Sequence, residues 1–227
     1  MAITVAGQVG PQILSDGATQ VIRQGRSGEL VFQELHGRFY EQAFRGGIFS
    51  GGMTVTSINA ATFTTATLGA TCTPIIGVWN PSTSVLNLVV LQATLAIVLT
   101  ALQNTGGGPF MWATSTGNAA LTLGNAPLNR KTLAASGSVA KDMSGIALTG
   151  LTNNLVVRGA STCGGGNVFN IASLDTAAGF STTLQPTVDN VDGAWIIPPG
   201  GLLALLATTT PVAQSAASGL LWEEVAT

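Results

Sequence analysis

Short apolar runs separated by clusters of turn-forming residues make up most of the chain after residue 52. The separators are rich in Gly, Asn, Ser and Pro, and no run sustains the 3.6-residue period of an amphipathic helix. Many short runs with frequent turns predict an all-β sandwich or barrel. The clearest runs are TFTTATL (62–68), PIIGVW (74–79), PFMWATS (109–115), NLVVRGA (154–160), LLALLATT (202–209) and GLLWEEVA (219–226).

The longest apolar run, VLNLVVLQATLAIVLTAL, spans residues 85–102 and carries no charge. A helix of this length would extend about 27 Å, close to what a bilayer requires. However, Asn87 and Gln92 interrupt the run, no Lys or Arg flanks it, and turn clusters bound it at 80–84 and 103–109. Its many β-branched residues favour a strand. We expect one long strand, or two with a bend, buried on both faces, rather than a membrane span.

Charge is scarce and unevenly distributed along the chain. Only 8% of the residues are charged, against roughly 25% in ordinary soluble domains. Many of these charges lie between Asp16 and Arg45, and none occurs from Gly46 to Asn129. Burial against sister subunits or neighbouring proteins would explain the uncharged stretch; a solvated face of Ser, Thr and Asn is the alternative. The net charge of −2 provides no basic surface for nucleic acid.

Residues 1–52 differ from the rest because they contain this charge cluster and the glycine breaks of RGGIFSGG (45–52). We interpret 1–52 as an arm or extension ahead of a sandwich at 53–227. The alternative is that 1–52 supplies the first strands of the domain. If the segment is an arm, its charged residues are the candidate contacts to a partner protein. These candidates are Arg23, Arg26, Glu29, Glu34, Arg38, Glu41 and Arg45.

The chain contains little that indicates catalysis. His36 is the only histidine, so any Ser–His–Asp or Cys–His device would depend on it. The two cysteines, Cys72 and Cys163, are too few for a zinc site or a disulfide framework, although one bridge is possible. The glycine runs at 106–110 and 163–167 lack the Lys-Ser/Thr of a phosphate loop. We expect no enzymatic activity and no cofactor.

One short cluster of oxygen ligands is a candidate metal site. Asp189, Asn190 and Asp192 precede a glycine in TVDNVDGAW, which spans 187–195. Ligands at this spacing can hold Ca²⁺, but the rest of a twelve-residue calcium loop is missing. A plain Asx turn is the alternative that the spacing favours.

Several segments together resemble virion structural proteins of tailed bacteriophages, in particular capsid decoration, or cement, proteins built on a jelly roll. In that pattern an Asn-Pro turn precedes a long apolar strand, a PPG turn precedes a later one, and a Trp-Glu-Glu strand closes the chain. Here these elements occur in order across about 200 residues. The segments are GELVFQELHGRFYEQAFRGGIF (28–49), PIIGVWNPSTSVLNLVVLQATLAIV (74–98), AWIIPPGGLLALLATT (194–209) and GLLWEEVAT (219–227).

The resemblance implies a jelly-roll β-sandwich, and the pattern of strands and turns predicts eight or nine antiparallel strands from about Met53 to Thr227. The uncharged stretch from Gly46 to Asn129 predicts a homo-oligomer, and the resemblance implies threefold packing and hence a trimer. The resemblance implies that the protein binds the phage major capsid protein and stabilises the head by bridging neighbouring subunits. The location would then be the capsid surface of the virion, after synthesis in the host cytoplasm. The alternative is a receptor-binding or tail-fibre-tip module, because function does not follow from fold. Five residues are expected to be largely buried: Trp79, Leu91, Trp195, Leu205 and Trp222.

Overall fold

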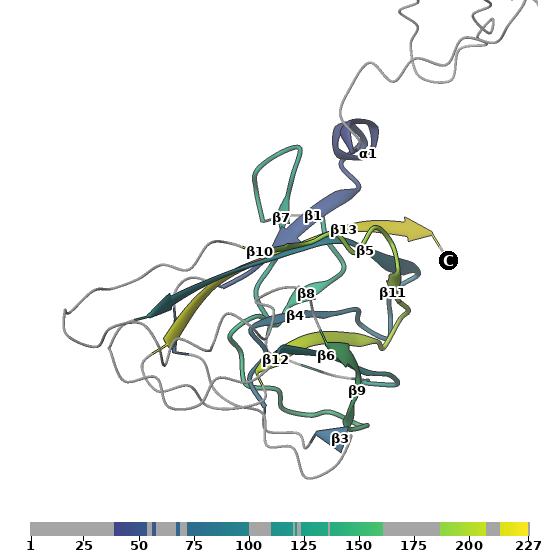
Figure 1. Ribbon diagram of the computed structural model, residues 1–227. Coiled ribbons are helices and arrows are strands. Elements are labelled where there is room, and N and C mark those ends of the chain that lie inside the picture. The colour runs from purple at the N-terminus through teal and green to yellow at the C-terminus, as the bar shows by residue number, and fades with distance from the viewer. Residues whose placement is uncertain are drawn as a thin grey trace, which may run out of the picture. The chain divides into compact units, whose positions relative to one another are not determined.

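The computed structural model is nearly all β (Figure 1). It describes residues 39–53, 56–57, 67–68, 72–99, 110–119, 121, 124–135, 137–160, 187–207 and 214–226. The chain divides into two units, Met1–Glu41 and Gln42–Thr227, and the sheets below belong to the second. The one helix among the described residues is α1, Tyr40–Arg45.

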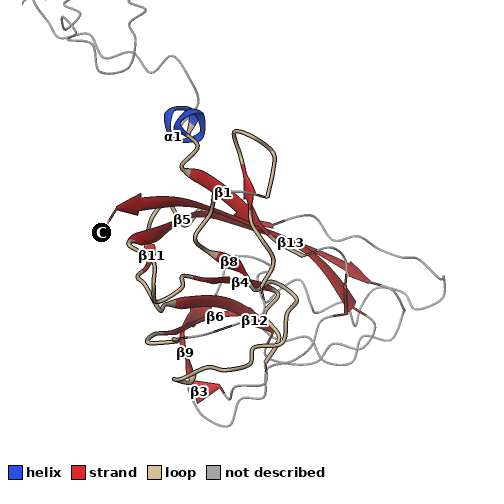
Figure 2. Cartoon of the chain, turned by 180° about the vertical axis from the view of Figure 1, so that it is seen from behind, coloured by secondary structure: helices blue, strands red, loops and turns tan. Residues whose placement is uncertain are grey.

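The strands form two antiparallel sheets, which lie one above the other in Figures 1 and 2. The larger sheet has the order β10-β5-β13-β1-β7, with β11 also paired to β5 and β2 to β13. Its long members are β5 and β13, which pair along almost their whole length. Its strands are β1 (Ile48–Gly51), β2 (Thr56–Ser57), β5 (Leu86–Leu99), β7 (Leu128–Asn129), β10 (Thr187–Asp189), β11 (Trp195–Ile197) and β13 (Gln214–Ala226).

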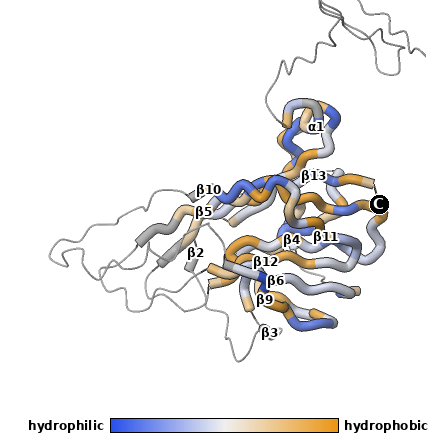
Figure 3. Tube along the Cα trace, turned by 45° about the vertical axis from the view of Figure 1, so that its right-hand side comes forward, coloured by the Kyte–Doolittle hydropathy of each residue, from blue (hydrophilic) through white to orange (hydrophobic). Residues whose placement is uncertain are grey.

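The smaller sheet has the order β3-β9-β6-β12-β4-β8. Its central strand, β12, is hydrophobic at every position (Figure 3) and buried at every position. Such a strand must be covered on both faces of the sheet, because its side chains alternate between them. Its strands are β3 (Thr67–Leu68), β4 (Ile76–Trp79), β6 (Phe110–Ser115), β8 (Lys141–Asp142), β9 (Leu155–Ala160) and β12 (Leu202–Ala207).

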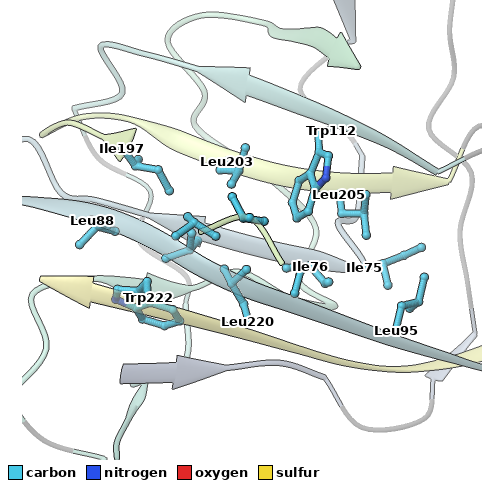
Figure 4. Packing of buried hydrophobic residues seen from close by; sticks show 14 of the residues in the cluster. Ile75, Ile76, Leu88, Leu95, Trp112, Ile197, Leu203, Leu205, Leu220 and Trp222 are labelled. Carbon is cyan, nitrogen blue, oxygen red and sulfur yellow. The ribbon is translucent and has the colours of Figure 1, made fainter. Parts of the chain in front are cut away.

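The main core fills the space between the two sheets (Figure 4). Leu88 and Leu95 of β5 and Trp222 of β13 face Leu203 and Leu205 of β12 across this space. All five side chains are buried almost completely. Burial of this kind stabilises by roughly 1.5–3 kcal/mol per large apolar side chain, so this layer fixes how the sheets pack.

A second core covers the far face of the smaller sheet. Leu202, Ala204 and Leu206 of β12 belong to it, together with Met143 and Leu148 from the segment after β8. The loop that follows β8 therefore covers this face, which accounts for the complete burial of β12.

The long apolar run at 85–102 contains a single strand, β5, with one irregularity at Leu91. Gln92 pairs with Leu221 and Val90 pairs with Trp222, so Leu91 is an extra residue on β5. The bulge shifts the inward set of side chains from Leu88 and Val90 before it to Ala93 and Leu95 after it. The strand prediction is confirmed, but burial on both faces is wrong: Val89, Gln92, Thr94 and Ala96 on the outward face are only partly buried.

The expected burial of five residues is largely met. Trp79, Leu91, Leu205 and Trp222 are buried, whereas Trp195 is partly exposed at the edge of the main core. The sandwich also begins earlier than the boundary at residue 53: Ile48–Gly51 forms β1, which pairs with both β13 and β7. These four residues therefore belong to the larger sheet and not to an arm.

The two turns that carry the Asn-Pro and Pro-Pro-Gly motifs contact each other. The Asn80 backbone exchanges hydrogen bonds with Gly200 and Gly201, at 2.8 and 2.9 Å. The buried Asn80 side chain donates to the backbone oxygens of Leu86, at 2.8 Å, and Ile197, at 3.0 Å. One asparagine thus ties the turn before β5 to the end of β11 and the start of β12.

Candidate interaction surface

The outward face of the larger sheet is formed by residues that pair across its strands, and it is exposed or partly exposed except at Ile48, which is buried. Residues directly opposite one another in antiparallel strands point to the same face. Outward residues can therefore be grouped as rows. The rows are Ile196–Val89–Glu223–Ile48, Gln92–Leu221–Ser50–Leu128 and Val188–Thr94–Gly219.

This face exposes three large apolar side chains and carries little charge. Val188, Ile196 and Leu128 are 47%, 59% and 48% exposed. Glu223 is the single charged residue in the described rows, and Arg130 lies next to them, just after β7. A surface that meets only water usually intersperses both signs of charge, whereas the centres of protein interfaces are depleted of charge.

A shallow groove of about 300 Å³ opens on this face. Its polar groups are a guanidinium, an amide and two hydroxyls, and two of its positions are glycines. A side chain at Gly219 would not fit unless Thr94 moved, since a Cβ there would lie 2.8 Å from Thr94 Oγ1. The lining residues are Ser50, Gly51, Gln92, Thr94, Arg130, Gly219, Leu220 and Leu221.

Arg130 is held at the groove by a compact turn. Its backbone N–H donates to Ile48 O at 2.9 Å. Asn129 Oδ1 accepts from the N–H groups of Lys131 and Thr132, at 2.9 and 3.2 Å, and its amide donates to Gly46 O at 2.8 Å. The Arg130 backbone is thus fixed beside β1, while its exposed side chain lines the groove.

The two glutamates of the last strand point in opposite directions, as their adjacent positions predict. Glu224 accepts hydrogen bonds from Ser138 Oγ, at 2.5 Å, and from the backbone N–H of Val139, at 3.3 Å. Glu223 lies on the outward face, partly buried. Burial raises the pKa of Glu223, and among the described residues no hydrogen bond or cation opposes that rise.

Two other ionisable groups are buried in the described part of the chain. Asp142 accepts from the backbone N–H groups of Gly52, at 2.8 Å, and Ser144, at 2.9 Å. Burial raises the pKa of Asp142, and these bonds oppose the rise only in part. Burial also raises the pKa of the Cys72 thiol to about 11. Both groups lie within packed structure, so neither forms an accessible reactive site.

The three calcium candidates do not converge. Asp189 Oδ2 accepts from Trp112 Nε1, at 3.4 Å, on the inner side of the sheet. Asn190 Oδ1 accepts from Gln92 Nε2, at 2.9 Å, on the outer side. Asp192 has φ of 52° in the turn between β10 and β11. These residues form a turn over the β5 bulge, and among the described residues no three His, Cys, Asp or Glu side chains group as metal ligands.

Most of the candidate partner contacts fall outside the described residues. Arg23, Arg26, Glu29, Glu34 and Arg38 do, as do His36 and Cys163. Glu41 lies in α1, where its side chain is not described, and Arg45 ends α1 with an exposed side chain. The pattern of the sequence did not single out Arg130, Gln92 or Thr94. Only the register of the strands brings these three to one groove.

The sheet edges in the described part of the chain are short. The outer strands β3, β7, β8, β10 and β11 are two or three residues long. Short edge strands limit pairing with another chain even where no other element covers them. The surface that best suits a partner is therefore a face of the larger sheet rather than an edge.

Comparison of this chain with protein-family models, curated proteins and solved structures found no match. Within the described ranges, no helix has the length and apolar character that crossing a bilayer requires.

Proposed function

We propose that the sandwich is a jelly roll. The support is the nesting of its strand pairs: β1 pairs with β13, β4 with β12, β5 with β10 and β11, and β6 with β9. Successive pairs lie alternately in the larger and the smaller sheet. A chain that folds back as one long hairpin and then wraps into two sheets produces this order, which is that of two Greek keys.

The function that the geometry supports best is that of a structural protein of a phage virion, which decorates the capsid and bridges neighbouring subunits without covalent chemistry. The observation that carries this proposal is the charge-poor, partly apolar outward face of the larger sheet. That face suits contact with another protein better than contact with water. The resemblance noted above supplies the class of partner, the major capsid protein, and the location on the outer surface of the head.

The resemblance also implies self-association, with a trimer as the expected form. The uncharged stretch from Gly46 to Asn129 contributes β1, β5 and β7 to the larger sheet. The segment without charge therefore builds much of the outward face. In this proposal residues 1–41, which we call the latch, hold the protein onto neighbouring capsid subunits. The charges of the latch set the position at which the protein binds the capsid. Many weak contacts repeated around a shell would then add by avidity.

The test is the number of copies in a purified virion, counted by mass spectrometry against the major capsid protein. Hundreds of copies support decoration. About a dozen copies would instead favour the tail-fibre-tip or receptor-binding module. A chain that is absent from virions would overturn both.

The latch is tested separately by deleting residues 1–41, which leaves every described strand intact. We expect the shortened chain to fold and to bind heads at reduced copy number. Full copy number and unchanged protection of heads against heat would exclude the latch. Deleting residues 1–52 is the control for folding, since that change also removes β1.

A further inference from the structure

Leu221 lies midway between Gly219 and Glu223 on the outward face of β13. Alternate residues of a strand point to the same side, so all three share this face. The register agrees: Gly219 pairs with Thr94, Leu221 with Gln92, and Glu223 with Val89. The groove position at Gly219 and the carboxylate are therefore equally far from Leu221, in opposite directions along one strand.

The groove has the chemistry of a carboxylate site. Arg130 brings a permanent positive charge, and a guanidinium pairs well with carboxylates. The hydroxyl of Ser50 can donate a hydrogen bond, whereas the Thr94 hydroxyl already donates to Gly219 O at 3.5 Å. Gln92 uses one N–H of its amide on Asn190, at 2.9 Å, and an amide nitrogen carries two.

Glu223 has the complementary character. It is a partly buried carboxylate on the same face, and its raised pKa reflects burial with no offsetting hydrogen bond or cation among the described residues. A carboxylate in this position gains most from a cation brought by another molecule.

We propose that the groove binds the Glu223 carboxylate of a second copy of this chain, in a reciprocal face-to-face contact about a two-fold axis above Leu221. The axis lies between the two facing sheets and runs perpendicular to β13. A half-turn about this axis reverses the direction of β13. Each residue that follows Leu221 in one copy therefore lies over the residue that precedes Leu221 by the same number of positions in the other copy. Glu223 of one copy then lies over Gly219 of the other, at the groove that Arg130 lines. The two Leu221 side chains meet at the axis.

The spacing favours a second copy over another anionic partner. A two-fold contact uses the same patch on both molecules, so each must present the group that the other accepts. Within the described residues, this face presents a carboxylate and a groove with a cation at matched positions about Leu221. The groove that Gly219 lines has a volume of about 300 Å³, which is room enough for an incoming carboxylate. The inference rests on the self-association part of the proposed function and assigns it a face and a pair of residues.

The test uses the full chain with two charge reversals, Arg130→Glu and Glu223→Arg, studied by sedimentation equilibrium. Each single variant places like charges at both reciprocal sites of the homodimer. We expect the association constant to fall more than about 100-fold in each, the scale of loss that close like charges cause. The sedimenting mass should halve relative to wild type. If threefold packing also operates, a hexamer should become a trimer.

Mixing the two single variants gives the decisive result. In the mixed pair, the glutamate introduced at position 130 of one chain meets the arginine introduced at position 223 of the other. At the second site the native Arg130 meets the native Glu223. Both contacts are attractive, so the mixture should associate as tightly as wild type although neither variant associates alone. A contact within one chain cannot give this rescue, and a head-to-tail ring with an odd number of chains, such as a trimer, restores only part of its contacts.

Lys141→Glu is the matched control, because Lys141 is an exposed cation on β8 of the other sheet. It should leave the mass unchanged. Leu221→Lys, which places two like charges at the axis, should halve the mass without touching either member of the pair. A monomeric wild type, single variants that associate normally, or a mixture without rescue would each overturn the contact. Counting copies per virion tests the proposed function independently of all these outcomes.

Discussion

The Asp142 carboxylate accepts a 2.8 Å hydrogen bond from the backbone N–H of Gly52, and this bond joins the two sheets. Asp142 belongs to β8 of the smaller sheet, whereas Gly52 follows β1 of the larger one. Ser218 of β13 makes a second link by donating to Ile75 O at 2.8 Å. Two polar groups thus fix the position of one sheet relative to the other where apolar packing alone would allow sliding.

The stability of the protein should depend on pH through Asp142. Burial raises its pKa above the ordinary 3.8 in the folded state, so the folded protein holds this proton more tightly than the unfolded chain does. The free energy of unfolding should therefore fall as the pH rises from 3.8 through the folded pKa, and then level off. Urea unfolding of wild type and Asp142→Asn between acid and neutral pH measures this contribution as the difference between the two proteins. A difference that stays constant, or that grows in favour of wild type with rising pH, would contradict the assignment.

Gly51→Ala should destabilise the sandwich. A Cβ at Gly51 would lie 2.6 Å from Asp142 Cγ, and the buried carboxylate cannot move without losing its bond to Gly52. We expect a loss of about 1–3 kcal/mol, as overpacking usually causes, in chemical denaturation. Gly159→Ala is the control, because a Cβ there meets nothing within 4 Å. Equal stability of the two variants would show that the contact at Gly51 relaxes freely.

Asn80→Asp, which replaces the amide nitrogen with an oxygen, should strongly lower the free energy of unfolding. The buried amide donates to two backbone oxygens, and a carboxylate would direct a negative charge at both. The cost should exceed the roughly 1–3 kcal/mol of an unsatisfied neutral group. The melting temperature gives the readout. Asn153→Asp serves as the comparison. The Asn153 amide donates to Thr116 O at an exposed position, so this substitution should lower the melting temperature only slightly. Similar melting temperatures for the two variants would argue against the role given to Asn80.

Cys72 should resist thiol reagents until the protein unfolds. Its folded pKa of about 11, against an ordinary 9.0, leaves very little thiolate at a mildly alkaline pH of about 8. With Cys163 replaced by serine, labelling by a disulfide reagent should be at least about 100-fold slower in the native state than in urea. The same variant in both solutions provides its own reference. A native rate close to the unfolded rate would mean that the thiol is accessible.

The outward face illustrates what strand spacing can and cannot reveal. The last strand was recognisable, and adjacent positions alone predicted that Glu223 and Glu224 point to opposite faces. Which of them faces outward was not predictable, because that depends on the bulge at Leu91 and on the register of β13 against β5. The groove could not be foreseen either. Its lining residues come from separate parts of the chain, β1, β5, β13 and the turn after β7, and meet only after the sheet has formed.

The sequence by itself determined the all-β class, the strand at Leu86–Leu99 and the burial of residues such as Trp222, because alternation, β-branching and turn residues act locally. Tertiary structure decided the rest. It placed Ile48–Gly51 inside the larger sheet, covered β12 on both faces, and separated Asp189 and Asn190 to opposite sides of the sheet. These outcomes depend on long-range pairing and on single-residue bulges. One extra residue reverses which side chains face the core, and no local pattern records where that residue is accommodated.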